Sequence, residues 1–132
     1  MEVCMNRFLT KTFYKQRSDF DQMTVSRSKT MKFPEGVTEY KDIRYAGDNR
    51  KEHRLDLFRP GGKDDRVLPV ILNVHGGGMV LGNKEFNRYF CARLSAMGLL
   101  VCSIEYRLIP DVQIFDQFKD LSLAMDFIKE IL

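Results

Sequence analysis

Apolar residues recur along the first half of the chain at two spacings, one typical of helices and one typical of strands. Between positions 5 and 23 they stand among charged residues at roughly helical spacing, which predicts one or two amphipathic helices. These apolar residues are Phe8, Leu9, Phe13 and Phe20. The polar stretch 26–32 is interpreted as a connector. Two β-prone runs follow, at 37–46 and 53–60, and the polar residues between them predict an antiparallel hairpin.

The second half of the chain predicts a strand, a helix, another strand and a final helix. The run 68–74 is almost continuously apolar, which suits a strand covered on both faces, as in a parallel sheet. Helical spacing follows at 86–97 and stops at Gly98, a residue type that commonly ends helices. The run 99–104 predicts a second buried strand, and 118–132 a second helix. Strand, helix and strand of these lengths indicate a βαβ unit with parallel strands.

Length and composition fit one soluble globular domain. A chain of 132 residues can bury roughly two thirds of the surface that it exposes when unfolded, and a second domain is not expected. Hydrophobic residues make up 44% and charged residues 30%, which are globular values. No apolar run approaches the ~20 residues that a membrane-spanning helix requires.

The net charge of +3 is concentrated near the start of the chain, because residues 1–33 carry seven basic and three acidic side chains. A basic segment can bind nucleic acid or a membrane surface. Here the basic residues are interleaved with acidic ones, and the segment shows neither an aromatic platform for bases nor the spacing of zinc ligands. A solvated helical face is therefore favoured, and no nucleic-acid partner is expected.

Three cysteines, Cys4, Cys91 and Cys102, form no CxxC pair and leave one unpaired, so neither a disulfide framework nor a zinc site is indicated. This pattern fits a reducing compartment, and we expect a cytoplasmic protein. The first residues carry charges where a signal peptide has its apolar stretch. No metal or organic cofactor is expected.

The segment with the clearest chemical signal is 73–78, which reads NVHGGG directly after a buried strand. Glycines allow unusual backbone conformations and let a substrate approach main-chain N–H groups. Such donors can stabilise an oxyanion, and losing one typically costs about 2.7 to 4 kcal/mol of transition-state stabilisation. We expect at least one of Gly76, Gly77 and Gly78 to have a positive φ or an unpaired N–H. A merely flexible turn would explain neither His75 nor the position between strand and helix.

HGGGMVLG and EYRLIPD together resemble the hormone-sensitive-lipase branch of the α/β-hydrolases, from about Val37 to the end of the chain. The resemblance implies a three-layer α/β-hydrolase-like fold, with a truncated mixed sheet in which an antiparallel hairpin precedes a parallel βαβ unit. It implies that Gly77 and Gly78 supply oxyanion-hole N–H groups and that Gly76 shapes the turn. His75 would support the loop and is not assigned as catalytic base.

The same resemblance divides the chain into an N-terminal helical cap segment, 1–33, and the N-terminal half of an α/β-hydrolase domain, 34–132. The turn residues Met79, Val80 and Leu81 would lie near the floor of the pocket under the cap. The fourth strand would lie between the second and third, which leaves the strand Val70 to Val74 as an uncovered edge. An apolar edge invites pairing, so self-association through this strand is expected.

The second motif is weaker, because residues 112–115 depart from the family pattern that Tyr106 to Asp111 follow. Asp120 falls where the family has an acidic residue at the start of a helix. Arg107 would form an ion pair with either Asp111 or Asp120, and a purely structural role is at least as good an interpretation as a direct one.

The G-x-S-x-G nucleophile motif of this fold does not occur in the 132 residues. Ser95, Ser103 and Ser122 have no glycine turn around them and are interpreted as structural. The two histidines are His53, in the hairpin, and His75. The resemblance therefore implies a carboxylic-ester hydrolase whose nucleophile, acid and base lie beyond residue 132, so that the chain alone is inactive. The complete enzyme would take a small-molecule ester.

Two other classes remain open. The first is a dinucleotide-binding protein, because the spacing of Gly76, Gly78 and Gly82 after a strand loosely resembles a phosphate-binding turn. Glu105, at the end of the next strand, would be its acidic residue. The third glycine falls one residue late for G-x-G-x-x-G, and the acid follows too far along the chain. A non-catalytic remnant or interaction protein of the same fold is the second alternative, because the sequence lacks a triad.

Overall fold

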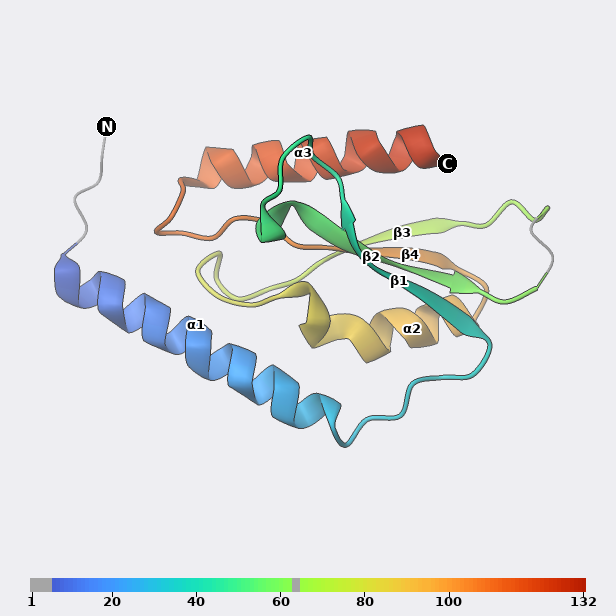
Figure 1. The fold of residues 1–132 in the computed structure, drawn as a ribbon, viewed down its shortest axis with the longest axis horizontal. Coiled ribbons are helices and arrows are strands. Elements are labelled where there is room, and N and C mark those ends of the chain that lie inside the picture. Colours follow the sequence, from blue (N-terminus) through green and yellow to red (C-terminus); the bar gives the residue numbers. More distant parts are fainter. Residues whose placement is uncertain (1–5, 63–64) are drawn as a thin grey trace.

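The computed structural model describes residues 6–62 and 65–132, which form a four-stranded sheet with helices on both faces (Figure 1). In chain order the helices and strands are α1 (Arg7–Ser28), β1 (Val37–Arg44), β2 (Arg54–Pro60), β3 (Val70–Val74), α2 (Arg88–Ala96), β4 (Leu100–Ile104) and α3 (Ile114–Ile131). Short 3-10 turns, η1 (Lys51–His53) and η2 (Lys84–Asn87), precede β2 and α2. The expected three-layer α/β architecture is confirmed.

The strand order in the sheet is β1-β2-β4-β3. β1 pairs with β2, and β2 with β4, in antiparallel orientation, whereas β3 and β4 are parallel with Val74 opposite Ile104. The predicted hairpin, the parallel pair and the position of β4 between β2 and β3 are all confirmed. Within the described residues β3 is consequently an edge strand. The carboxyl ends of β3 and β4 lie side by side, so the loops that follow them meet.

Two apolar clusters cover the two faces of the sheet. On one face Leu55 and Ile104 pack with Ala124 and Ile128 of α3. On the other face Phe58 packs with α2, through a cluster that comprises Cys91, Ala92 and Val101. Figure 1 shows α1 and α2 on the side of the sheet opposite α3. None of the helices in residues 6–62 and 65–132 combines the length and apolar composition needed to cross a membrane.

Local signals explain where the helices begin and end. The side chain of Asn6 accepts a hydrogen bond from the N–H of Phe8 and caps α1. Gly98 follows α2 with a φ of 101°, and its N–H donates to the carbonyl of Ser95, which ends the helix as predicted. At the start of α3 Gln113 and Asp116 form a reciprocal capping box.

The structure differs from the sequence prediction in several boundaries. The first helical segment is one continuous helix that runs to Ser28, so the connector begins later than expected. β3 begins at Val70 rather than at residue 68, and it is not covered on both faces, since Val70 is 43% and Val74 41% exposed. β4, in contrast, is buried along its whole length. The apolar composition of β3 therefore did not distinguish an edge position from a central one.

Candidate active site

The loop that leaves β3 is a tight turn built on glycines. Gly77 and Gly78 have φ values of 137° and 59°, and Met79 follows at 68°, so three successive residues lie in the region that favours glycine. The carbonyl of Gly77 accepts hydrogen bonds from the N–H groups of Val80 and Leu81, both at 3.2 Å. The expectation of a positive φ among the three glycines is confirmed.

The backbone N–H groups of Gly77 and Gly78 donate no hydrogen bond to any residue that the structure describes. Both precede the hydrogen bonds that close the turn, and neither belongs to a strand or helix. An orphan N–H on a glycine, with no side chain beside it, is a donor that an incoming oxygen can use. The turn thus has the groups that an oxyanion site requires.

The glycines of the loop are not equivalent in their surroundings. A Cβ atom on Gly77 would collide with the carbonyl group of Leu81, and one on Gly82 with the carbonyl oxygen of Gly76 and the ring of His75. At Gly76 and Gly78 an added Cβ would have no atom within 4 Å. The turn therefore requires glycine at Gly77 and Gly82 for lack of space, and at Gly78 only for its positive φ.

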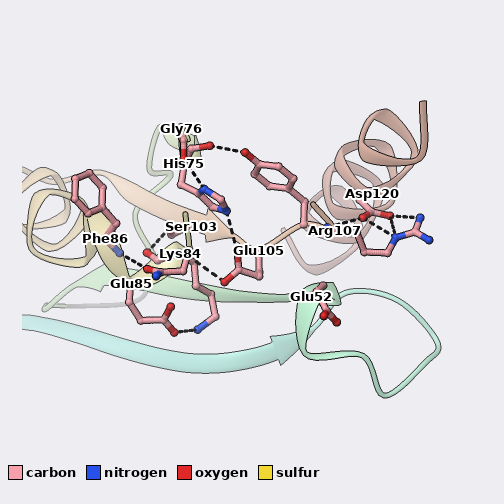
Figure 2. Close-up of polar contacts among 12 residues, drawn as sticks. Glu52, His75, Gly76, Lys84, Glu85, Phe86, Ser103, Glu105, Arg107 and Asp120 are labelled. Carbon is pink, nitrogen blue, oxygen red and sulfur yellow. Dashed lines mark hydrogen bonds and ion pairs between the residues drawn. The ribbon is translucent and has the colours of Figure 1, made fainter. Parts of the chain in front are cut away.

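His75 is buried behind the turn and has both ring nitrogens engaged. Nε2 lies 2.8 Å from Oε1 of Glu105, and Nδ1 lies 2.9 Å from the carbonyl oxygen of Gly76. Figure 2 shows the imidazole turned toward Glu105. The ring also stacks on Tyr106, with centroids 4.4 Å apart, and the Tyr106 hydroxyl donates to the carbonyl of His75 at 2.7 Å. Neither ring nitrogen faces open space for a substrate, which fits a supporting role.

Two side chains from different helices hold the carbonyls at the outer end of the turn. Nε2 of Gln117, on α3, donates to the carbonyl of Met79 at 2.9 Å. Nε of Arg17, on α1, donates to the carbonyl of Val80 at 3.1 Å. Arg17 also donates to the carbonyl of Ile109 and forms an ion pair with Asp111 at 2.8 Å. The turn is thus fixed by contacts from both sides of the sheet.

A buried lysine stabilises the start of η2. Nζ of Lys84, a residue only 3% exposed, lies 3.0 Å from Asp42, 3.0 Å from Asp56 and 2.6 Å from Glu85. Burial opposes the charge of Lys84, but Glu85, Asp56 and Asp42 outweigh it, so its pKa lies above the ordinary value. Burial also raises the pKa of Asp56, against hydrogen bonds from Asp42 and Lys84 that lower it. The backbone N–H of Lys84 donates to Glu105, which links this cluster to His75.

Arg107 pairs with Asp120 and not with Asp111, so the first of the two alternatives from the sequence is wrong. Nε and Nη2 of Arg107 both contact the Asp120 carboxylate, at distances down to 2.7 Å, and the Arg107 N–H adds a third donor. His53 contacts the same carboxylate at 2.9 Å (Figure 2 shows Arg107 facing Asp120). Burial of Asp120 raises its pKa, but the hydrogen bonds from Arg107 and His53 outweigh this and leave the pKa below its usual value. The pair stabilises the loop after β4 against α3.

A cavity of about 350 Å³ lies between α1 and the loops that follow β3 and β4. Its charged lining comprises Asp21, Asp42, Glu52, Glu85, Glu105 and Asp111 together with Arg17, Lys51 and Lys84. Most of these groups are already paired with one another. The cavity is also lined by the apolar or aromatic side chains of Val25, Tyr106 and Leu108.

The serines within the described residues show no nucleophile arrangement. Ser103, in β4, accepts from Asn73 and donates to the carbonyl of Lys84. Ser95 is buried in α2 with its hydroxyl unpartnered among the described atoms, and Ser122 is exposed on α3. Both described thiols, Cys91 and Cys102, are unpaired, and burial raises the pKa of each to about 11. Cys4 lies outside the described residues.

A model of the BD-FAE family matches residues 55–131, from β2 to the end of α3. The chain belongs to the BD-FAE family. The BD-FAE match covers the glycine turn, the Tyr106 to Asp111 segment and Gln117. The chain is also 32% identical over 98 residues to 3-O-acetylpapaveroxine carboxylesterase CXE1 of Papaver somniferum. This alignment covers 68% of the chain and 30% of that enzyme.

Further similarity extends to a probable isoprenylcysteine alpha-carbonyl methylesterase of Oryza sativa, at 34% identity over 76 residues, 58% of this chain and 18% of that protein. Among solved structures, inhibited esterase B of Lactobacillus rhamnosis superposes with a TM-score of 0.87 at 23% identity, covering 94% of this chain and 40% of that one. The BD-FAE chain has the α/β-hydrolase fold of esterases. It spans about a third of the length of the first curated relative that it matches.

The glycine turn was identified from the sequence, but the side chains that contact and stabilise it were not. Gln117, Arg17 and Lys84 belong to no motif, and each acts through contacts with residues far away along the chain. Arg17, for example, is 63 positions from Val80. The sequence signal for Gln117 was its place on the face of α3 that also carries the buried residues Ala124 and Ile128.

Proposed function

We propose that this chain supplies the oxyanion-binding part of a serine carboxylesterase. In this account the N–H groups of Gly77 and Gly78 donate to the oxyanion that forms when a serine attacks an ester carbonyl. Gly76 shapes the turn, and His75 supports it from behind. The substrate is a small-molecule carboxylic ester.

The observation that carries the proposal is the glycine turn at the carboxyl end of β3. Its two N–H groups are unbonded among the described residues, and its carbonyl groups accept hydrogen bonds from α1, from α3 and from the segment that follows β4. A loop that only connected β3 to α2 would not need a buried histidine, a stacked tyrosine and a buried glutamine behind it. Membership of the BD-FAE family and the likeness to carboxylesterases support the same assignment.

The remaining catalytic groups are proposed to lie beyond residue 132. The 132 residues contain no G-x-S-x-G, and His53 and His75 are both engaged with carboxylates. We therefore expect the chain alone not to turn over esters. An oxyanion site without nucleophile and base retains only a fraction of the rate acceleration of a complete serine hydrolase.

We assign α1 to a cap segment that spans residues 1–33. The supporting contacts are those of Arg17 with Val80 and Ile109, and of Tyr14 with Asp111, because they seat α1 over the loops that follow β3 and β4. Within this proposal the cap contacts the oxyanion turn directly, through the hydrogen bond from Arg17 to the carbonyl of Val80. The unpaired buried thiols are consistent with a reducing, cytoplasmic compartment.

The experiment has two parts. The nucleotide sequence that follows codon 132 is determined first, since a reading frame that encodes G-x-S-x-G is required by the proposal, whereas an immediate stop codon favours a non-catalytic remnant. The longest product that contains these residues is then assayed with p-nitrophenyl acetate and butyrate. A fluorophosphonate probe, which labels activated serines, identifies the nucleophile.

A further inference from the structure

Gln117 is a buried amide that connects two loops. It is 4% exposed and lies in the first turns of α3. Its Nε2 donates to the carbonyl of Met79, at 2.9 Å, and to the carbonyl of Arg107, at 3.0 Å. One side-chain amide thus uses both of its N–H groups, one on the glycine turn and one on the segment that follows β4.

Met79 is the residue of the turn whose conformation most needs support. Its φ of 68° is left-handed, and a side chain in that region costs about 1 to 2 kcal/mol. Gly77 and Gly78 adopt positive φ at no comparable cost, because they lack a Cβ. Relaxation of the turn would therefore begin at Met79.

The carbonyl of Met79 has two donors. The N–H of Ile109 lies 3.0 Å away, and Gln117 provides the second hydrogen bond. Rotation of Met79 to a negative φ would move this carbonyl away from both donors. It would also rotate the neighbouring peptide groups, and thus change where the N–H groups of Gly77 and Gly78 point.

We propose that Gln117 is a positioning residue for the oxyanion-binding turn, which acts by holding Met79 in its left-handed conformation. The inference rests on the function proposed above for Gly77 and Gly78. Gln117 itself touches neither substrate nor oxyanion. Its effect is transmitted through the Met79 carbonyl to the two glycine amides.

A packing role for Gln117 makes different predictions from a positioning role. Replacing Gln117 with methionine preserves the length of the side chain and removes both donors. Replacing Met79 with glycine removes the penalty for a positive φ and leaves the turn free to adopt it without help. If Gln117 acts by holding Met79, the change M79G compensates for Q117M; if Gln117 only fills space, it does not.

The test is amide NMR of the ¹⁵N-labelled chain. In Q117M the signals of Gly77, Gly78 and Met79 should shift and broaden. Hydrogen exchange of the Val80 and Leu81 amides, which donate to the Gly77 carbonyl, should accelerate by about tenfold or more, since loss of ~1.4 kcal/mol of local stability corresponds to that factor. The M79G/Q117M double variant should regain sharp signals for Gly77 and Gly78. The exposed Gln22, changed to methionine, is the matched control and should leave the turn unaffected.

Two results overturn the proposal: glycine signals that are unchanged in Q117M, or changes in Q117M that M79G does not reverse. Should Q117M fail to fold, the proposal is tested on the unaltered chain. The measurement is the scalar coupling across the hydrogen bond between Nε2 of Gln117 and the carbonyl carbon of Met79. Absence of that coupling contradicts the proposal.

The readout is independent of ester hydrolysis, so the positioning role and the oxyanion role fail separately. In an esterase product that contains this chain, Q117M should also lower kcat by roughly tenfold with little change in KM. An altered turn with unchanged kcat would leave the positioning intact and remove the oxyanion assignment.

Discussion

The hydroxyl of Tyr106 donates to the carbonyl of His75 at 2.7 Å, while the two rings stack with their centroids 4.4 Å apart. Tyr106, the second residue after β4, therefore fixes both the backbone and the side chain of His75, the first residue after β3. Because β3 and β4 are parallel neighbours, their carboxyl ends bring these residues together. The glycine turn begins directly after His75, whose position these contacts fix.

Removing the Tyr106 hydroxyl should destabilise the chain. In Y106F the buried carbonyl of His75 loses its donor, which typically costs about 1 to 3 kcal/mol. Urea unfolding followed by circular dichroism measures the change. Y40F, at an exposed position of β1, serves as the control and should stay within about 0.5 kcal/mol. Equal effects of the two changes would show that the Tyr106 hydrogen bond contributes nothing.

The glycines of the turn should respond unequally to alanine. G77A places a Cβ against the Leu81 carbonyl at a φ that alanine rarely adopts, and we expect a loss of about 2 kcal/mol or more. G76A has open space and no positive φ, so its cost should stay within about 0.5 kcal/mol. Thermal and urea unfolding compare the two variants. A G76A variant as unstable as G77A would contradict the described turn.

The Arg107–Asp120 pair should make stability depend on acid pH. The pKa of Asp120 is below its ordinary value of 3.8, so its contribution is present above that value and is lost as the pH falls through the lower, folded-state pKa. D120N should cost about 3 to 5 kcal/mol at neutral pH, because it leaves Arg107 and His53 without their buried partner.

Below about pH 4 the difference between D120N and the unaltered chain should shrink, since Asp120 is protonated there in the unfolded state and increasingly in the folded state. Stability curves between pH 7 and pH 3 test this, with the exposed D126N on the same helix as control. A difference that stayed constant over that range would contradict the assignment.

The exposed edge of β3 should cause self-association of the isolated chain. Val70 and Val74 are 43% and 41% exposed, and their strand has one unpaired side among the described residues. Light scattering over a range of concentrations should show dimers or larger species. V70K should shift the chain toward monomer, whereas Y40K on the opposite edge strand β1 should not. A monodisperse monomer at all concentrations would remove this interface.

The fold was largely predictable because it depends on local periodicity. Two β-prone runs separated by polar residues identified the hairpin, continuous apolar runs identified β3 and β4, and Gly98 marked the end of α2. The partial exposure of β3 was not predictable from its composition, because an apolar strand has the same sequence in the centre of a sheet and at its edge. The continuous α1 was likewise hidden, since its last turn is polar.

The candidate site was predictable only in its glycines. Three consecutive glycines beside a histidine led to the proposed oxyanion role, and two of them, Gly77 and Gly78, have positive φ values. The residues that stabilise the turn were not predictable, because their roles arise from pairings across the fold. Gln117 is 38 positions from Met79, and nothing in the local sequence relates the two.

The central claim is that Gly77 and Gly78 form the oxyanion hole of a carboxylesterase whose nucleophile lies beyond residue 132. The most direct measurement is p-nitrophenyl butyrate hydrolysis together with fluorophosphonate labelling. The 132-residue chain should show background hydrolysis and no labelling. In a longer product that carries G-x-S-x-G, G78V should lower kcat by roughly 10²- to 10³-fold without abolishing labelling. An unchanged kcat in G78V, or stoichiometric labelling of Ser95, Ser103 or Ser122 with turnover by the chain alone, would contradict the account.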